Sequence, residues 1–391
     1  MRILFVCSSW RVFGAEIVTL KTLEGLQRNG HSLQAVTSTW SDGEFSRRLA
    51  ALGIPEVKVP LGTFSKRLSL RPMLWTADAL VRLPLLWFRF HRTLRKFQPE
   101  AVLYTSSKQA VWLFPWLKGR PSFLIEHNSL VASQSNRFIY RKLGAKLCGF
   151  VAVSDYMAKR LCLLGAPSEK VRVIKNGVFF EADAKATGSA SGTLPQHQSG
   201  LPCVGIAGQI SPHKGHDCLF EAVRLLIARG TKLEVKVYGA CNSDYVNHLE
   251  ERISQAGLAK HWSFMGYESD RNKIYPGLDI CVMPSCVVET FGMVAAEAGA
   301  FGVPVVASRR GGLPEVVEDG VTGWLIDPDQ PLQLADKIEW LIQNPDRARA
   351  MGAAGRERVF KLFTVEKMAG DFEKLFAEFT EPVQRFKQIP S

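Results

Sequence analysis

The chain alternates between short apolar runs and amphipathic stretches over most of its 391 residues, and this alternation strongly constrains its fold. Apolar runs of roughly four to eight residues are typical of buried strands, and the stretches between them have helical spacing. Strands that alternate with helices predict parallel sheets with right-handed crossovers. The expected strands form two sets, Arg2–Ser8, Ser32–Thr37, Ala101–Thr105, Ser122–Glu126, Gly149–Val153 and Val171–Ile174, then Val204–Ala207, Leu233–Tyr238, His261–Met265, Ile280–Met283, Val303–Ala307 and Gly323–Ile326.

The two sets are separated by a stretch rich in Ala, Ser, Thr, Gly and Gln that has no apolar period. Such a composition is typical of a flexible surface connection. A chain of this length is also too long for one compact domain. We therefore expect an N-terminal domain over residues 1–180, a linker over 181–200, a second domain over 201–375 and a C-terminal helix over 376–391.

Composition narrows the class of protein. With 46% hydrophobic residues the chain can bury a sizeable core, yet it contains no apolar stretch long enough to span a membrane. We also expect no signal peptide, because the first residues lack a long apolar core and a cleavage site. The eight cysteines are scattered, without zinc-binding spacing, and we expect them to be reduced in a cytoplasmic protein. The eight histidines do not cluster with carboxylates, apart from Glu126-His127, and strand geometry predicts that these two neighbours face opposite ways.

A loop after the strand Val204–Ala207 contains Gly208, and further on Lys214 and Gly215 precede an amphipathic helix. This arrangement brings a positive charge to the carboxyl edge of a sheet. Lysine binds phosphate as a compact charge with rotatable donors. The loop therefore predicts a phosphate-binding site.

A second loop follows the strand Ile280–Met283. Glu289 lies on this loop, and Glu297 lies in the first turns of the next helix. Ligands of open α/β sheets bind at this edge, and the free amides of a helix start favour an anion. The alternative interpretation is two solvated glutamates around an ordinary turn, because short motifs produce false matches.

Taken together, Gly208-x5-Lys214-Gly215 and Glu289-x7-Glu297 resemble the nucleotide-sugar domain of the family 4 retaining glycosyltransferases. Gly311-Gly312-Leu-Pro-Glu315, with the stretch 319–326 after it, matches the next part of that pattern. The resemblance spans nearly the whole chain and is most specific in its second half. It implies the α/β GT-B fold, in which two Rossmann-like, doubly wound parallel-sheet domains face each other across a cleft and the last helix crosses back to the first domain.

The resemblance also implies a role for each matching residue. Lys214 and the backbone around Phe291, Gly292 and Met293 would bind the diphosphate of a nucleoside-diphosphate sugar such as a UDP-sugar. Glu297 would accept the ribose hydroxyls, and Glu289 would face the donor sugar. The segment Phe264-Met265-Gly266 would lie beside the base. The candidate donor-binding residues are thus Gly14, Gln209, Lys214, Met265, Gly266, Glu289, Phe291, Gly292, Met293 and Glu297.

Two of these expectations concern the first domain. Gly14 would approach the phosphates at the start of a helix, where a side chain would block the backbone. His127 would lie near the reacting sugar, although a hydrogen-bonded structural histidine is the alternative. The candidate catalytic residues are Glu289, Lys214 and His127.

The chain departs from the family pattern at Gln209, where the family has Arg. A neutral amide lacks the charge and the bidentate geometry of a guanidinium. Lys214 would then carry more of the leaving-group charge, so that donor affinity is lower or Arg309 or Arg310 compensates. We expect no metal and no cofactor, because Asp327-Pro-Asp329 has the letters of an Asp-x-Asp motif but lies outside the matching region.

The positive charge is concentrated in one segment. Residues 61–150 contain fifteen Lys and Arg residues and three acidic residues, a net charge of +12 that equals the charge of the whole chain. A basic segment rich in aromatic residues is typical of a membrane-surface binder. A solvated helix face and a nucleic-acid patch are the alternatives, and the second lacks any recognisable binding motif. The expected membrane or acceptor surface consists of Arg82, Trp87, Arg89, Arg92 and Arg95.

These patterns together predict a retaining, metal-independent glycosyltransferase. Its donor would be a nucleoside-diphosphate sugar, and its acceptor a saccharide, lipid-linked, at the cytoplasmic membrane face. The product would belong to an envelope or exported polysaccharide, such as lipopolysaccharide or exopolysaccharide, and no nucleic-acid partner is expected. The alternatives are an epimerase or phosphorylase on the same fold, and a donor-binding or scaffolding protein in which Gln209 marks lost activity.

Overall fold

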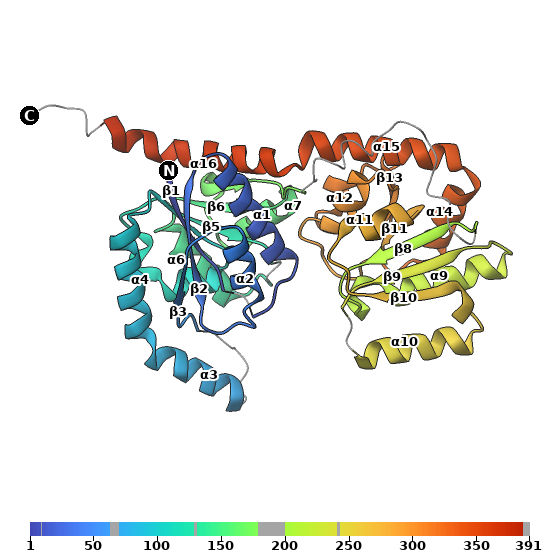
Figure 1. Ribbon diagram of the computed structural model, residues 1–391, viewed down its shortest axis with the longest axis horizontal. Coiled ribbons are helices and arrows are strands. Elements are labelled where there is room, and N and C mark those ends of the chain that lie inside the picture. The colour runs from blue at the N-terminus through green and yellow to red at the C-terminus, as the bar shows by residue number, and fades with distance from the viewer. Residues whose placement is uncertain (9, 63–69, 129–130, 179–199, 241–242, 386–391) are drawn as a thin grey trace, which may run out of the picture. The chain divides into compact units, whose positions relative to one another are not determined.

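The computed structural model describes residues 1–8, 10–62, 70–128, 131–178, 200–240 and 243–385. The chain forms two compact units (Figure 1). Unit 1 comprises Met1–Gly177 and Val365–Ser391, and unit 2 comprises Val178–Thr364. Apart from Gly200, the predicted linker lies outside the described residues.

Unit 1 is built on a parallel sheet of seven strands in the order β3-β2-β1-β4-β5-β6-β7. From β1 the chain runs outward to β2 and β3, and then continues on the other side of β1 with β4. Every residue of β4, β5 and β6 is buried, as expected of parallel strands whose two faces are covered by helices. The strands are β1 (Arg2–Val6), β2 (Ser32–Ser38), β3 (Glu56–Val59), β4 (Ala101–Tyr104), β5 (Ser122–Glu126), β6 (Gly149–Ala152) and β7 (Val171–Val173).

The helices of unit 1 flank this sheet (Figure 1). Ser106, Ser133 and Ser154 cap three of them, because each side chain accepts a hydrogen bond from a free backbone amide of the first turn. The α-helices are α1 (Gly14–Arg28), α2 (Glu44–Ala51), α3 (Leu70–Val81), α4 (Leu83–Phe97), α5 (Ser107–Trp112), α6 (Gln134–Gly144), α7 (Asp155–Leu163) and α16 (Val365–Arg385), and the short 3-10 helices are η1 (Phe114–Leu117) and η2 (Ser168–Lys170).

Unit 2 repeats the design with six parallel strands in the order β10-β9-β8-β11-β12-β13. Its strands are β8 (Cys203–Ala207), β9 (Glu234–Tyr238), β10 (Trp262–Gly266), β11 (Ile280–Met283), β12 (Val305–Ser308) and β13 (Gly323–Ile326). The helices are α9 (His216–Ala228), α10 (Ser243–Gln255), α11 (Arg271–Ile274), α12 (Met293–Ala300), α13 (Leu313–Val316), α14 (Pro331–Gln343) and α15 (Pro345–Leu362), with η3 (Pro212–Lys214), η4 (Ala259–His261) and η5 (Tyr275–Gly277). Two parallel α/β sheets confirm the predicted fold class.

The last helix belongs to unit 1. Along α16 the buried residues recur every three or four positions, at Met368, Phe372 and Phe376 among others, so one apolar stripe faces the core. Gly25 of α1 allows the two helices to approach, because a Cβ there would lie 2.8 Å from Cγ1 of Val365. The predicted boundaries at 375 and 376 are therefore too late, since the chain from Val365 on belongs to unit 1.

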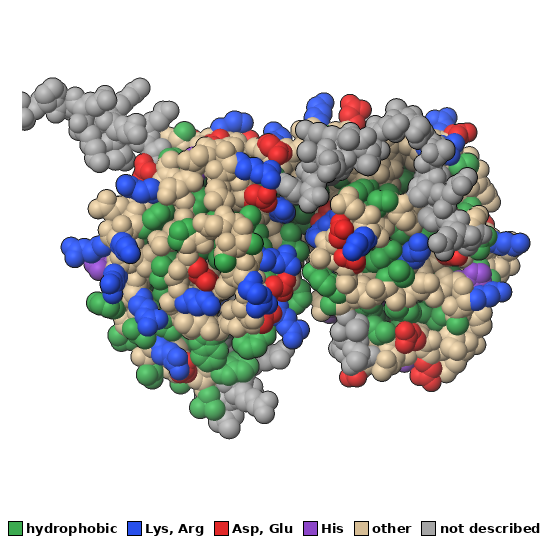
Figure 2. Space-filling model, in the orientation of Figure 1, with side chains coloured by type: hydrophobic (Ala, Val, Ile, Leu, Met, Phe, Trp, Pro, Cys, Tyr) green, Lys and Arg blue, Asp and Glu red, His purple; other side chains and the backbone are tan. Residues whose placement is uncertain are grey.

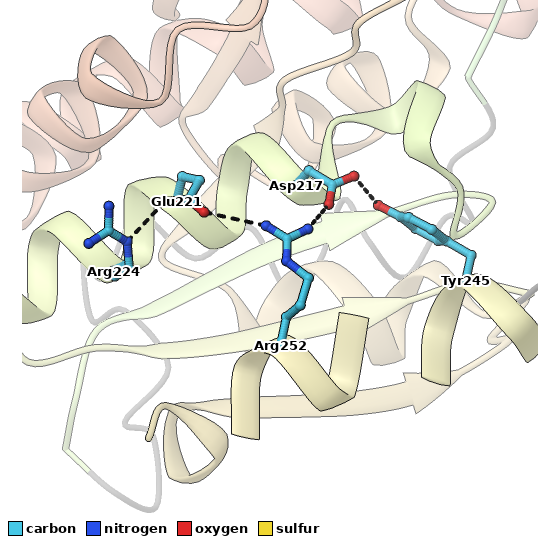
Figure 3. A network of polar contacts seen from close by, with 5 residues as sticks. All are labelled: Asp217, Glu221, Arg224, Tyr245 and Arg252. Carbon is cyan, nitrogen blue, oxygen red and sulfur yellow. Dashed lines mark hydrogen bonds and ion pairs between the residues drawn. The ribbon is translucent and has the colours of Figure 1, made fainter. Parts of the chain in front are cut away.

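A polar network joins α9 to α10 in unit 2 (Figure 3). Asp217 accepts hydrogen bonds from Arg252 and, at 2.7 Å, from the hydroxyl of Tyr245. Arg252 also reaches Glu221 at 3.3 Å, and Arg224 contacts the same carboxylate at 2.9 Å. Exposed ion pairs stabilise by only about 0–1 kcal/mol each, so the network serves mainly to fix α10 against the first turns of α9.

Two histidines are buried in neutral form. Burial lowers the pKa of His127 to about 4. The pKa of His216 is also lowered to about 4, mainly by burial, although the carbonyl of Ser211 lies 3.2 Å from its Nδ1. The ordinary pKa of a histidine is 6.5. Below this pH, the two imidazoles bind protons in the unfolded chain but stay neutral in the folded protein. Stability is therefore lost as the pH falls from 6.5 toward 4.

We expect this loss to be measurable. Between pH 7 and pH 5, each of the two histidines should lower the free energy of unfolding by roughly 2 kcal/mol, so the variant His127→Gln/His216→Gln should lose less stability on acidification. Urea unfolding of both proteins at the two pH values measures the difference. His248→Gln, on an exposed site of α10, is the control. An equally steep loss in the double variant would contradict the assignment.

Candidate active site

The candidate site of unit 2 lies where the strand order reverses between β8 and β11. Lys214 ends η3 in the loop after β8, and Glu289 lies in the loop after β11. The two side chains form an ion pair, with Nζ of Lys214 2.6 Å from Oε1 of Glu289. The lysine side chain is 31% exposed and the carboxylate 15%, so the pair is partly open to a ligand. The structure thus brings together one residue from each of the two sequence motifs.

The surroundings of Glu289 hold its side chain and its backbone. The hydroxyl of Ser285 donates a 2.8 Å hydrogen bond to the same oxygen that Lys214 contacts. The backbone amide of Gly312 donates to the carbonyl of Glu289, also at 2.8 Å. An ammonium has three donors, so Lys214 keeps donors for another anion after it has bound Glu289.

The loops after β8 and β11 pack directly against each other. Gly215 adopts φ +79°, and any side chain there would collide with the carbonyl of Pro284. The backbone amide of Cys286 donates to the carbonyl of His213 at 3.0 Å. The position of Lys214 is therefore set by backbone contacts as well as by its ion pair.

The start of α12 follows Glu289 closely. Phe291 is fully buried, with its ring edge-on to Phe363 at a centroid distance of 5.4 Å. Gly292 is the N-cap residue and Met293 is the first residue of the helix. The first amides of a helix have no acceptor within the helix, so this anchored turn presents free donors and a partial positive charge.

Glu297 lies one turn further along α12 and is only 8% exposed. The hydroxyl of Tyr275 donates to its Oε2 at 2.7 Å, and the guanidinium of Arg271 contacts its Oε1 at 3.1 Å. Burial beside this carboxylate raises the pKa of Tyr275, so the phenol keeps its proton and remains a donor. Each oxygen of Glu297 has a further lone pair that could accept a ligand hydroxyl.

Sequence reasoning missed Arg271, Tyr275 and Ser285. None of them belongs to a recognised motif, and the first two lie 26 and 22 residues before Glu297. Only a tyrosine in an otherwise polar segment distinguishes this stretch, and that signal is too weak to use. Their role depends on the packing of η5 and α11 against α12, which spacing does not predict.

Other candidate donor-binding residues lie at the edges of these loops. Gln209 is exposed in the loop after β8, and Met265, which is 49% exposed, precedes Gly266 at the end of β10. Gly14 belongs to unit 1, where it is the exposed first residue of α1.

The two arginines that could compensate for Gln209 differ in their partners. Arg309 pairs with Asp319, whereas Arg310 donates to the carbonyl of Cys286 in the loop that carries Glu289.

Unit 1 has a cavity of about 1120 Å³ at its own strand-order reversal, between β1 and β4. Both Glu126 and His127 line it, which corrects the prediction that they face opposite ways. The alternation does not apply, because β5 ends at Glu126 and His127 already belongs to the loop. The Nε2 atom of His127 is buried and has no partner among the described residues.

The basic surface of unit 1 lies on α3 and α4. Arg89, Arg92 and Arg95 are exposed, and Arg82 forms an ion pair with Asp78 at 2.8 Å. Trp87 is half-buried, and its indole N–H donates to the carbonyl of Trp112 at 3.0 Å, which agrees for this residue with the alternative of a helix that packs on the core.

Apolar side chains are exposed on the same two helices. The largest exposed ones are Trp75 and Phe88. No helix among the described residues is long and apolar enough to cross a membrane. The same part of the chain contains no group of three or more His, Cys, Asp or Glu side chains that could hold a metal ion.

Comparisons with known proteins agree with this geometry. Residues 12–181 match the family described as Glycosyltransferase Family 4, and residues 195–358 match Glycosyl transferases group 1. A GDP-mannose-dependent alpha-(1-6)-phosphatidylinositol monomannoside mannosyltransferase of Mycobacterium tuberculosis is 29% identical over 57% of this chain. A D-inositol 3-phosphate glycosyltransferase of Segniliparus rotundus is 33% identical over 49%. The alignments span 60% and 43% of these two enzymes, so the chain spans about half the length of the curated relatives that it matches.

Solved structures extend the likeness to nearly the whole chain. The crystal structure of Anabaena Alr3699/HepE in complex with UDP is 21% identical, with a TM-score of 0.78 over 97% of this chain and 100% of the Anabaena chain. At this identity the likeness concerns the fold alone. The two family matches together cover more than half of the chain and confirm the resemblance found in the motifs. The chain therefore belongs to the family 4 glycosyltransferases and has the GT-B fold.

Proposed function

We propose that the chain is a retaining, metal-independent glycosyltransferase that moves a sugar from a nucleoside-diphosphate sugar to a saccharide acceptor. The observation that carries this proposal is the ion pair of Lys214 with Glu289 beside the free amides of α12. A positive charge next to a helix start suits a diphosphate. The names of the relatives support a sugar nucleotide as donor, since one is GDP-mannose-dependent and a structural neighbour binds UDP.

Different residues would bind the different groups of the donor. Lys214 and the amides of Gly292 and Met293 would hold the diphosphate, and Glu297 would accept the two ribose hydroxyls. Tyr275 and Arg271 already fix the carboxylate of Glu297, so it does not have to be ordered when the donor binds. Arg310, rather than the Asp319-bound Arg309, is the arginine that would supply the charge missing at Gln209.

Negative charge grows on the departing diphosphate as the bond to the sugar breaks. A fixed ammonium and fixed amides stabilise that charge without reorganisation in the transition state. The acceptor hydroxyl would attack on the face that the diphosphate leaves, which retains the anomeric configuration. A nucleophilic Glu289 fits less well, because one of its oxygens already accepts bonds from Lys214 and Ser285.

A panel of nucleoside-diphosphate sugars, with and without saccharide acceptors, tests the function. Rapid release of nucleoside diphosphate should depend on the acceptor, whereas an epimerase would convert the donor alone and a scaffolding protein would only bind it. Replacing Lys214 by Ala should lower turnover by at least about a hundredfold, as expected for one contact to developing charge. Lys232→Ala, at an exposed position of the same unit, is the matched control. Normal turnover by the Lys214 variant would show that the diphosphate binds elsewhere.

The two glutamates should differ in what they affect. Glu297→Gln should weaken binding of free nucleoside diphosphate, because the ribose loses its charged acceptor and Arg271 loses its partner. Glu289→Gln should mainly slow sugar transfer, since its carboxylate orients Lys214 and faces the sugar. Calorimetric titration of each variant, together with its turnover, separates the two effects. Equal losses of affinity would refute this division of roles.

We further propose that the acceptor is lipid-linked and that α3 and α4 bind an anionic membrane surface at the cytoplasmic face, for an envelope or exported polysaccharide. Figure 2 shows Lys and Arg side chains in blue along the border of unit 1 where Figure 1 places α4, with apolar side chains in green toward α3. Arg92 and Arg95 are exposed cations, and Trp75 and Phe88 are exposed aromatics. This combination of charge and apolar surface suits the boundary of an anionic bilayer.

Reversing Arg89, Arg92 and Arg95 to Glu should release the protein from anionic vesicles. Each Lys or Arg near anionic lipid contributes about 1 kcal/mol, so three together matter. Raising the salt concentration should weaken binding of the native protein, because ions screen the attraction. Vesicle sedimentation measures both effects.

A matched control carries the same change of charge elsewhere. Lys232, Lys260 and Arg347 are exposed residues of unit 2, and their reversal to Glu should leave binding to vesicles unchanged. Sedimentation of the α4 variant to the same extent as the native protein would identify these arginines as a solvated helix face.

A further inference from the structure

The described part of the unit 1 cavity wall carries little charge. Its charged side chains among the described residues are Glu16, Lys108 and Glu126. Glu16 also caps α1, since its Oε2 accepts the backbone amide of Phe13 at 3.0 Å. The remaining polar wall consists of hydroxyls and amides, including Ser8, Thr105, Ser107, Asn128, Ser135 and Asn136. Among the described lining residues, one cation and two carboxyl groups make a poor environment for an anionic ligand.

The carboxyl group of Glu126 is the most buried of these charged groups. The side chain is 1% exposed, and it accepts hydrogen bonds from the hydroxyl of Tyr140 at 2.5 Å and from the amide of Asn128 at 3.3 Å. Ser107 is a third hydrogen-bond donor to this carboxyl group, and all three donors among the described residues are neutral. Burial raises the pKa of this carboxyl group. A ligand phosphate beside it would add a second charge where the first is already unfavourable.

His127 adds a neutral polar atom to the same wall. The side chain is nine-tenths buried, and its Nε2 has no partner among the described residues. Burial lowers the pKa of His127 to about 4, so at neutral pH the imidazole brings no charge to bind an anion. A buried polar atom without a partner is costly, and a ligand hydroxyl could satisfy it either as donor or as acceptor.

The rest of the cavity suits the carbon-bound faces of sugar rings. Phe45, Val111, Ile139 and the ring of Tyr140 form an apolar wall beside the hydroxyls and amides. Small-ligand pockets are typically about 300–1,000 Å³, so a cavity of about 1120 Å³ has room for more than one sugar ring.

We propose that this cavity binds an uncharged, hydroxyl-rich saccharide and discriminates against phosphorylated or carboxylated sugars. The proposal rests on the proposed function in taking this ligand as the acceptor. It sets the chain apart from the relative whose name gives D-inositol 3-phosphate as its substrate. The neutral terminus of a lipid-linked saccharide is the acceptor class that fits.

Direct binding to the full chain, without a donor, tests the cavity. The probes are matched pairs: myo-inositol with inositol 3-phosphate, and methyl mannoside with mannose 6-phosphate. The methyl signals of Val111 and Ile139 report on the cavity wall by NMR. We expect the neutral member of each pair to shift these signals, and the phosphorylated member to bind at least about tenfold more weakly, which corresponds to about 1.4 kcal/mol.

Two variants at the rim sharpen the test. Val131 lines the cavity with its side chain 74% exposed, so Val131→Lys adds a cation without removing buried packing. This variant should bind the phosphorylated probes more tightly than the native protein does, and Val131→Gln should not. In Lys108→Gln, which removes the cation of the described wall, binding of the neutral probes should persist.

Three results would overturn the proposal. They are tighter binding of the phosphorylated probes by the native protein, loss of neutral-probe binding in Lys108→Gln, and no shift of the cavity signals with any neutral probe. Binding of the neutral probes without transfer from any sugar nucleotide would count against the proposed function alone. The two proposals can therefore fail separately.

Discussion

Both candidate sites depend on the point in each sheet where the chain changes direction. In a parallel sheet wound outward from its middle, the loops after the two central strands run to opposite sides and leave a crevice at the carboxyl edge. In unit 2 these strands are β8 and β11, and their loops bring together Lys214 and Glu289, which are 75 residues apart. In unit 1 they are β1 and β4, where Gln109 donates to the hydroxyl of Ser8 at 3.1 Å. The strand order alone therefore determines where in each sheet the two candidate sites lie, whatever their side chains are.

The two crevices differ in their electrostatics, although their topology is the same. In unit 2, each of the two carboxylates of the candidate site forms an ion pair, Glu289 with Lys214 and Glu297 with Arg271. These contacts fix the position of each carboxylate. In unit 1, Glu126 is held by neutral donors. A diphosphate, with its formal charges, suits the first environment, and a neutral polyol suits the second.

Much of the fold could be predicted because buried parallel strands are nearly continuous apolar runs. The bounds of β5, β11 and β13 agree with the prediction, while β3 was missed, since Glu56-Val-Lys-Val alternates charge with apolar residues at the edge of the sheet. The Lys214 and Glu289 loops were predicted from spacing along the chain. Contacts across helices were not, and this is why the partners of Glu297 were missed. For Trp87, periodicity could not show which residue accepts the hydrogen bond of the indole N–H.

The membership of α16 in unit 1 has a consequence for synthesis of the protein. Residues of unit 2 are contiguous, so its sheet and core can be completed while the chain is still being made. Unit 1 is different, because the face of α1 that carries Thr22 and Gly25 is covered by residues made some 340 positions later. Until then, part of its apolar core has no cover. A newly made chain would therefore finish the unit that begins second before the unit that begins first.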